Sequence, residues 1–228
     1  MKDTKSVSSK NNKDDKSSKN SKSNKNIKKS VKPLFCILGA SGSGKTTMCE
    51  GLEKALGLRQ IPSYTTRPPR YENEPGHIFI NDRQYGKLKV IVAENITTGY
   101  KYCITQGQIN NQRYDLYVVD LTGLKVLKKN YHGGRPIVTI WLETPLRQRY
   151  DRLKARYLKH IKDIHDPESV EKAINSALER IVSDAVEFTG YEKYCKYIID
   201  NSDGNFDRAF DRLLYIVTDG QVGQKDDV

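Results

Sequence analysis

Short apolar runs alternate along this chain with segments whose apolar residues recur at helical spacing. The apolar runs of strand length are 34–38, 115–121, 136–142 and 194–201. Helical spacing follows several of them, and the last such segment, Phe206–Val217, is amphipathic. Apolar strands that alternate with helices are typical of a parallel sheet covered by helices on both faces. The pattern therefore predicts an α/β fold with a central parallel sheet flanked by helices.

A different pattern occupies the region before the second apolar run. Residues 87–94 and 101–105 alternate between apolar and polar positions, which predicts strands with one buried face. We expect these strands to form a small β-rich subdomain, at about residues 63–107, that is inserted into the α/β fold.

The first apolar run leads directly into a glycine-rich loop. Residues 39–46 read GASGSGKT and match the pattern G-x-x-x-x-G-K-[ST], which is the P-loop that binds nucleoside triphosphate phosphates. Glycines allow the backbone N–H groups to turn toward one point, and the helix that follows adds its positive dipole end. Lys45 is placed to reach the β- and γ-phosphates, and the Thr46 hydroxyl to ligate Mg²⁺. The residues expected to bind ATP here are Gly39, Ala40, Ser41, Gly42, Ser43, Gly44, Lys45, Thr46 and Thr47.

Charge is distributed unevenly along the chain. Of the formal net charge of +11, most lies in residues 1–32, which hold eleven lysines and three aspartates. This Lys/Ser/Asn-rich segment has too little apolar surface to offset the entropy of ordering, so we expect it to be disordered. It is either a solvated tail or a basic arm for nucleic acid, and the lack of arginine and aromatic residues favours the first interpretation. The folded remainder is almost neutral, which gives little reason to expect a nucleic-acid partner.

Cysteine usage and hydropathy indicate in which cellular compartment the protein is expected. Four cysteines occur without any C-x-x-C pair, which argues against a disulfide framework or a zinc site. No apolar run approaches the length of a transmembrane helix, and the N-terminus has no signal-peptide pattern. We expect a cytoplasmic protein that has no contact with a membrane.

Two arginines follow the segment 59–64, which looks like a short second strand. Arg67 and Arg70 flank a pair of prolines, which exclude a helix and place both guanidinium groups on a turn or an extended loop. Guanidinium groups bind phosphate oxygens in a bidentate way, so the pair suggests a clamp for a second phosphate. Taken alone, an exposed arginine pair without function would be the commoner occurrence.

The order of these motifs resembles the guanylate kinase family. A P-loop is followed by S-x-T-T-R-x-x-R at 63–70 and then by a glycine and an aromatic residue. The resemblance implies that Ser63, Arg67 and Arg70 hold the phosphate of an acceptor GMP. Phe79 stands where the family usually has a tyrosine, so the hydroxyl contact to phosphate is lost at that position.

Further positions match the family in part. The segment 99–104 is similar to G-N-x-Y-G-[ST], and Tyr102 falls on the phosphate-binding tyrosine. Cys103 and Ile104 replace a glycine and a base-contacting hydroxyl residue. Ala93 replaces the glutamate that pairs with guanine, and the adjacent Glu94 could serve in its place if the loop is one residue shorter.

An acidic residue closes the second apolar run. Asp120 retains one acid of the family's D-x-D-x-x-G, at the strand end where α/β proteins place their ligands. It is our candidate for contacting the base or a Mg²⁺-bound water, and the alternative is an N-cap of the next helix.

The second half of the chain resembles the family's ATP-closing lid, which we expect at about residues 150–180. Arg152 and Arg156 match R-L-x-x-R and share one helix face, and Arg180 resembles the arginine that reaches the transferring phosphate. A solvated basic helix face would show the same spacing. Asn201 lies where the family's N-[DN] turn approaches adenine.

The resemblance covers about residues 33–217 and implies a P-loop NTPase fold, followed by a polar tail at 218–228. The expected reaction is ATP-dependent phosphorylation of a nucleoside monophosphate, GMP or dGMP, with Mg²⁺. The catalytic residues would be Lys45, Arg67, Arg152, Arg156 and Arg180. The alternatives are another nucleoside monophosphate or a sugar phosphate as acceptor, or a non-catalytic guanylate-kinase-like binding module, against which the intact Lys45 and Thr46 argue.

Overall fold

The structure, a computed structural model, describes residues 31–69, 72–97, 99–161 and 163–218. The basic segment predicted at 1–32 lies outside the described residues except for its last two positions, and so does the C-terminal tail beyond position 218. Among the described helices, none combines the length and the apolar character that crossing a membrane requires.

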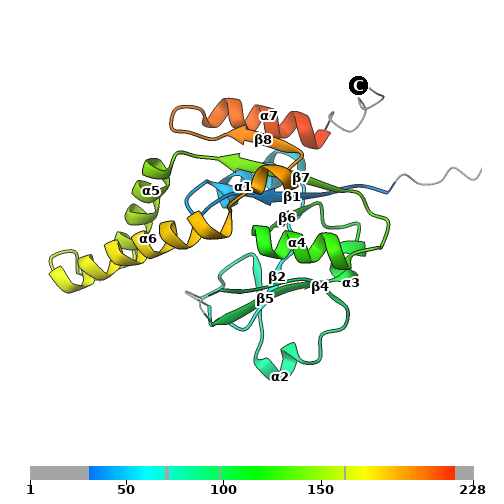
Figure 1. Ribbon diagram of the computed structural model, residues 1–228, viewed down its shortest axis with the longest axis horizontal. Coiled ribbons are helices and arrows are strands. Elements are labelled where there is room, and N and C mark those ends of the chain that lie inside the picture. Colours follow the sequence, from blue (N-terminus) through cyan, green and yellow to red (C-terminus); the bar gives the residue numbers. More distant parts are fainter. Residues whose placement is uncertain (1–30, 70–71, 98, 162, 219–228) are drawn as a thin grey trace, which may run out of the picture. The chain divides into compact units, whose positions relative to one another are not determined.

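Four parallel strands form the central sheet (Figure 1). Their spatial order is β6 (Leu116–Val118), β1 (Leu34–Leu38), β7 (Ile137–Glu143) and β8 (Tyr197–Asp200). Each neighbouring pair is parallel. The sequence-based prediction of a central parallel sheet is therefore confirmed, and its central strand β1 has the predicted bounds.

Helices cover both faces of this sheet (Figure 1). They are α1 (Lys45–Leu56), α4 (Leu121–Asn130) and α7 (Phe206–Thr218). Alternate side chains of a strand point to opposite faces, and β1 uses both. Cys36 packs in the half of the core that contains Leu124 of α4. Ile37 packs in the other half, with Leu52 of α1 and Leu213 of α7.

A second sheet is inserted between α1 and β6 along the chain. Its strands, in spatial order, are β3 (His77–Phe79), β2 (Ser63–Thr65), β5 (Tyr100–Thr105) and β4 (Ile91–Thr97). Two short helices accompany it, α2 (Asp82–Tyr85) and α3 (Gln106–Asn110). The strand predicted at 87–94 begins later, at Ile91. Val90 has a φ of 51°, which is incompatible with a strand at that residue.

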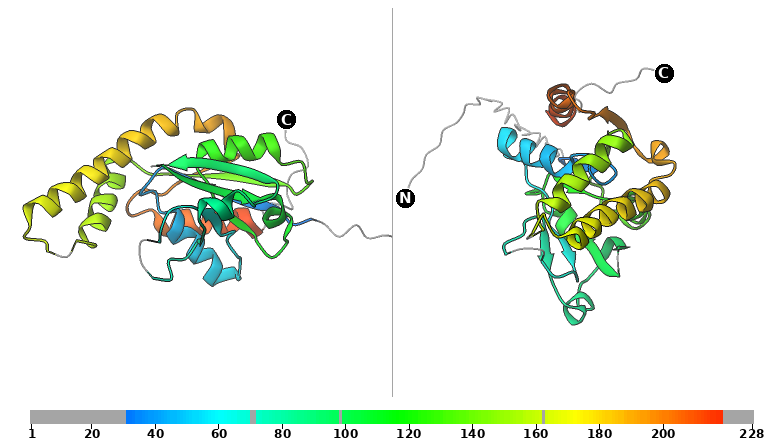
Figure 2. Two further views of the ribbon diagram at one scale, coloured as in Figure 1. Left: turned by 90° about the horizontal axis from the view of Figure 1, so that it is seen from below. Right: turned by 90° about the vertical axis from the view of Figure 1, so that its left-hand side faces the viewer.

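The remaining helices form an antiparallel pair that extends from the central sheet (Figure 2). α5 (Leu146–Leu158) and α6 (Pro167–Glu187) pack through a small cluster that includes Leu153 and Ile181. Asp166 caps the start of α6 by accepting from the Ser169 N–H, and Pro167 takes the first helical position. A short 3₁₀ helix, η1 (Tyr191–Tyr194), leads to β8.

Candidate active site

The P-loop connects β1 to α1 and has the backbone geometry that the glycines predict. Gly42 and Gly44 have φ values of 80° and 90°, a region that residues with a Cβ rarely adopt. The space is also restricted, because a Cβ on Gly44 would lie 2.6 Å from Nδ2 of Asn201. Lys45 opens α1 and folds back onto the loop, where its Nζ donates to the carbonyl oxygens of Gly39 at 2.6 Å and Ala40 at 3.1 Å.

Two of the predicted site residues support the loop from behind. The Asn201 side chain is buried, and its Nδ2 donates to the Ser43 carbonyl at 2.7 Å. Arg152 of α5 donates to the Gly42 carbonyl at 3.2 Å and to Oδ1 of Asp203 at 2.6 Å. The loop is therefore fixed by β8 and α5, elements far away in sequence.

An acidic side chain of α6 also enters the P-loop. Asp184 is buried and accepts from the Ser41 N–H at 2.5 Å and from the Ser41 hydroxyl at 3.2 Å. The same hydroxyl accepts from Nε of Arg180 at 2.8 Å. Nη1 of Arg149 lies 3.6 Å from the carboxylate. The sequence analysis gave Asp184 no role, although its spacing of four residues from Arg180 places both side chains on one helix face.

Burial changes the ionisation of two side chains in the site. Burial lowers the pKa of Lys45 from 10.5 to about 8, although the negative charge of Asp184 acts in the opposite direction. Burial raises the pKa of Glu187 from 4.5 to about 7, and the negative charges of Asp120 and Asp184 add to the effect. Among the described residues, the buried Oε1 atom of Glu187 has no hydrogen-bond partner. The sequence analysis did not identify Glu187.

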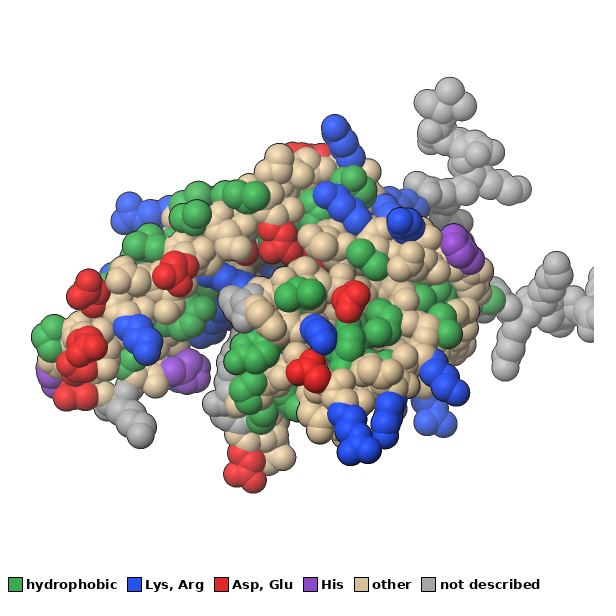
Figure 3. Space-filling view, turned by 60° about the horizontal axis from the view of Figure 1, so that its bottom comes forward, with side chains coloured by type: hydrophobic (Ala, Val, Ile, Leu, Met, Phe, Trp, Pro, Cys, Tyr) green, Lys and Arg blue, Asp and Glu red, His purple; other side chains and the backbone are tan. Residues whose placement is uncertain are grey.

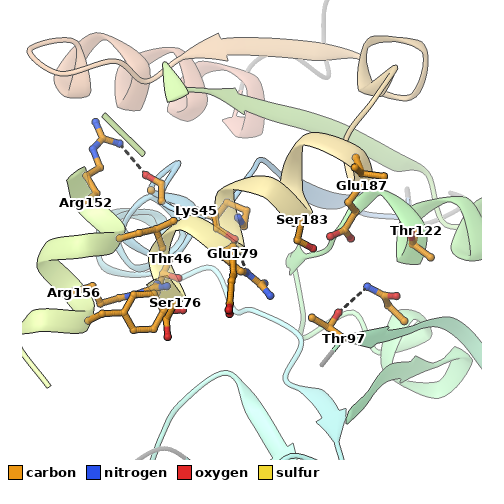
Figure 4. A pocket seen from close by; sticks show the side chains of 18 of the residues that line it. Lys45, Thr46, Thr97, Thr122, Arg152, Arg156, Ser176, Glu179, Ser183 and Glu187 are labelled. Atoms are coloured by element: carbon orange, nitrogen blue, oxygen red, sulfur yellow. Dashed lines mark hydrogen bonds between the residues drawn. The ribbon is translucent and has the colours of Figure 1, made fainter. Parts of the chain in front are cut away.

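A cavity of about 1070 Å³ opens between the P-loop, α5 and α6. Figure 3 shows a hollow in the surface at this part of the protein, with basic side chains inside it. Figure 4 shows Arg156 of α5 at one side of the pocket, and Glu187 of α6 at the other side together with Thr97 and Thr122. The predicted ATP residues that line this cavity are Ser41, Gly42, Gly44, Lys45, Thr46, Thr47, Arg152, Arg156 and Arg180.

A second cavity, of about 270 Å³, adjoins the first. Ser41, Lys45, Arg180 and Glu187 line both. The predicted acceptor residues that line the second cavity are Ser63, Arg67, Glu94, Tyr102 and Asp120. The structure therefore brings five of the seven predicted acceptor residues together next to the P-loop. The remaining two are Arg70, which lies outside the described residues, and Phe79.

Arg67 is held by a buried network. Its guanidinium group forms two hydrogen bonds with the Glu74 carboxylate, at 2.7 and 3.1 Å, and its Nε donates to the Tyr102 hydroxyl at 3.0 Å. Its carbon Cζ lies 5.4 Å from the centre of the Phe79 ring. Phe79 thus contributes a ring surface to Arg67 rather than a hydroxyl to the cavity.

The strand register decides which residues of β4 and β5 share a face. Asn95 lies opposite Tyr102, whereas Glu94 lies opposite Cys103. Because neighbouring residues of a strand point to opposite faces, Asn95 and Glu94 point away from each other. The Glu94 carboxylate accepts a hydrogen bond from the hydroxyl of Tyr85 in α2. Nδ2 of Asn95 donates to Oδ2 of Asp120 at 2.5 Å, so Asn95 is a cavity residue that the sequence analysis missed.

Asp120 lies at the cavity and also caps α4. Its Oδ1 accepts from the Gly123 N–H at 2.6 Å, which is the N-cap arrangement that the sequence analysis kept as its alternative. β6 ends two residues earlier, at Val118, so the apolar run predicted as a strand at 115–121 includes the first residue of the helix. Capping occupies only part of the carboxylate, and the residue still faces the cavity.

These elements define an α/β protein of the P-loop NTPase fold with an inserted β-rich subdomain. Among solved structures, guanylate kinase from Anaplasma phagocytophilum is similar to this chain with a TM-score of 0.57 and 16% sequence identity. The similarity covers 86% of this chain and 89% of that one. At this identity it establishes the fold. No protein-family model matches the chain, and no curated protein matches its sequence.

Proposed function

We propose that this protein is an ATP-dependent nucleoside monophosphate kinase whose acceptor is GMP or dGMP. The observation that carries the proposal is the pair of adjoining cavities with Lys45 and Arg180 in the lining of both. A phosphoryl group passes directly between two bound nucleotides in such a reaction, so the two sites must meet at a basic boundary. The fold similarity to a guanylate kinase supports the same class of reaction.

The donor site would be the larger cavity. Lys45 would leave the carbonyl oxygens of Gly39 and Ala40 and bind the triphosphate, while the N–H groups at the start of α1 bind it from the other side. Arg152, Arg156 and Arg180 would neutralise negative charge on the transferred group. α5 and α6 would act as the lid, and its closure would exclude water and so suppress hydrolysis of ATP.

Thr46 fits the expected role in binding Mg²⁺, because it is exposed and lines the larger cavity. No group of three or more His, Cys, Asp or Glu side chains in the described part of the chain is arranged to hold a metal ion. Mg²⁺ commonly relies on nucleotide phosphates for several of its contacts, so one protein hydroxyl is compatible with it. When bound, the ion supplies positive charge to the phosphate oxygens.

The acceptor site would be the smaller cavity. Ser63, Arg67, Arg70 and Tyr102 would bind the acceptor phosphate, and Asp120 would contact the base. Glu94 accepts the Tyr85 hydrogen bond through one carboxylate oxygen, and its other oxygen would join in base recognition. No side chain needs to attack the phosphorus, because the acceptor phosphate is itself the nucleophile. The residues therefore position the two substrates and balance their charge.

A different acceptor is the second candidate, and one observation favours it. Ala93 and Ile104 lie opposite each other in β4 and β5 and are fully buried in the core. These are the positions at which the family's polar residues would read guanine. An apolar pair there leaves base recognition to other residues, so another nucleoside monophosphate or a sugar phosphate is the alternative substrate.

A coupled assay of ADP release tests the proposal. The reaction contains ATP and Mg²⁺ with each ribo- or deoxyribonucleoside monophosphate of G, A, C, U and T in turn. Stimulation by GMP and dGMP alone is the expected result, and Lys45→Ala should abolish it. Lys54→Ala, at an exposed position of the same helix, is the matched control. ATP binding without stimulation by any monophosphate would instead support a binding module or a non-nucleotide acceptor.

A further inference from the structure

The smaller cavity contains a polar side chain that the expected acceptor site does not include. His77 lines this cavity together with Ser63, Arg67 and Tyr102. It lies in β3, which pairs with β2 so that His77 is directly opposite Ser63. Phe79 lies two residues further along the same strand and therefore on the same face.

The contacts of His77 fix its ring within the predicted phosphate clamp. Its Nδ1 lies 2.8 Å from the Ser63 hydroxyl oxygen, within hydrogen-bond distance. Its ring meets the rings of Tyr102 and Phe79 edge to face, with centroids 5.8 and 5.9 Å apart. The imidazole is thus held on two sides by aromatic rings, with one nitrogen directed at the serine expected to bind phosphate.

The side chains next to His77 do not supply all the contacts that a bound phosphate could accept. The guanidinium group of Arg67 is balanced by the buried Glu74 carboxylate. Phe79 brings no hydroxyl, although tyrosine is the residue that would supply one. Ser63 is therefore the side chain of β2 and β3 best able to donate to a phosphate at this place.

The hydrogen-bonding capacity of serine decides whether Ser63 can donate. Its hydroxyl has a single proton, which can be given either to the imidazole or to a phosphate oxygen, but not to both. If Nδ1 of His77 carries a proton and donates it to Ser63, the serine proton becomes available to the phosphate. Nδ1 is protonated in one neutral tautomer and in the imidazolium ion.

We propose that His77 is a positioning residue of the acceptor-phosphate site, which donates from Nδ1 to Ser63 and so directs the Ser63 hydroxyl proton to the phosphate of the acceptor. This inference rests on the proposed function, because it assumes that a nucleoside monophosphate occupies the smaller cavity. In this way His77 would give β3 a polar contact in the site, where Phe79 has no hydroxyl to contribute.

Two substitutions separate this role from packing. His77→Phe keeps a ring against Tyr102 and Phe79 but has no nitrogen. His77→Asn loses the ring but can place an amide N–H near the position of Nδ1. We expect His77→Phe to weaken GMP binding about tenfold in titration calorimetry, the size of effect typical of losing a hydrogen bond to a charged group. His77→Asn should recover most of the affinity, and both variants should bind guanosine and ATP like the wild type.

A double-mutant cycle tests the path through Ser63. In a Ser63→Ala background, His77→Phe should cause no further loss of GMP affinity, because the hydroxyl that His77 orients is gone. Unchanged GMP affinity in His77→Phe, an equal loss of guanosine affinity, or full additivity of the two substitutions would overturn the role of His77. A wild-type protein that turns over no monophosphate and binds none would overturn the proposed function, and this inference with it.

Discussion

Replacing Glu187 should change how stability depends on pH. Its folded-state pKa of about 7 lies above the ordinary value of 4.5, because burial and two neighbouring acids disfavour the carboxylate. Between these pH values the folded protein binds more protons at this site than the unfolded chain, so stability falls as pH rises through the window. The stabilising contribution of the protonated group is complete below pH 4.5 and lost above about 7. The Glu187→Gln variant cannot ionise at this position, so it should not lose this stabilising contribution as pH rises.

The size of the effect follows from the same values. Each pKa unit corresponds to about 1.4 kcal/mol, so a fully buried group with this difference would contribute about 3 kcal/mol. Glu187 is only partly buried and solvent screens the neighbouring charges, which reduces the expected effect to about 1–2 kcal/mol. We therefore expect the free energy of unfolding of Glu187→Gln, relative to that of the wild type, to increase by about 1–2 kcal/mol as pH rises from 5 to 8.

Urea denaturation at a series of pH values measures this difference. Trp141, the single tryptophan, is buried and stacks on Tyr191, so its fluorescence should report unfolding. Glu179→Gln, at an exposed position of the same helix, controls for the removal of a carboxylate. If the difference between Glu187→Gln and the wild type is the same at every pH, Glu187 does not titrate in this window and the reasoning is wrong.

Two further predictions concern the charged groups of the site. ATP affinity should fall as pH rises above about 8, because Lys45 of the free protein then loses its proton. Lys45→Arg remains charged, so in equilibrium binding measurements its ATP affinity should depend less on pH. An equally steep dependence in that variant would contradict the role of Lys45. Glu74→Gln should lower the free energy of unfolding by about 3 kcal/mol, because it leaves the buried guanidinium group of Arg67 without its counter-charge. A loss below about 1 kcal/mol in urea denaturation would mean that Arg67 gains another partner or reaches solvent.

Local signals in the sequence were sufficient for several elements. β1 has the predicted bounds, and Gly57 ends α1 in the left-handed conformation expected of a C-cap. Asp166 begins α6. These features depend on residues within one or two turns of each other, so the sequence alone can reveal them. The apolar run at 115–121 was less informative, since hydrophobicity cannot separate the end of a buried strand from the first residue of a buried helix.

The sequence by itself determined the phosphate loop and the α/β fold around it, because glycine placement, Lys45 and the alternation of apolar segments are local properties. The tertiary structure alone decided which side chains share the cavities. Strand pairing sets the register, and a shift of one residue exchanges the faces, which is why Asn95 rather than Glu94 reaches Asp120. Asp184 and Glu187 reach the cavities from α6, more than a hundred residues beyond the P-loop. Their proximity depends on how α6 packs, and no local pattern encodes that.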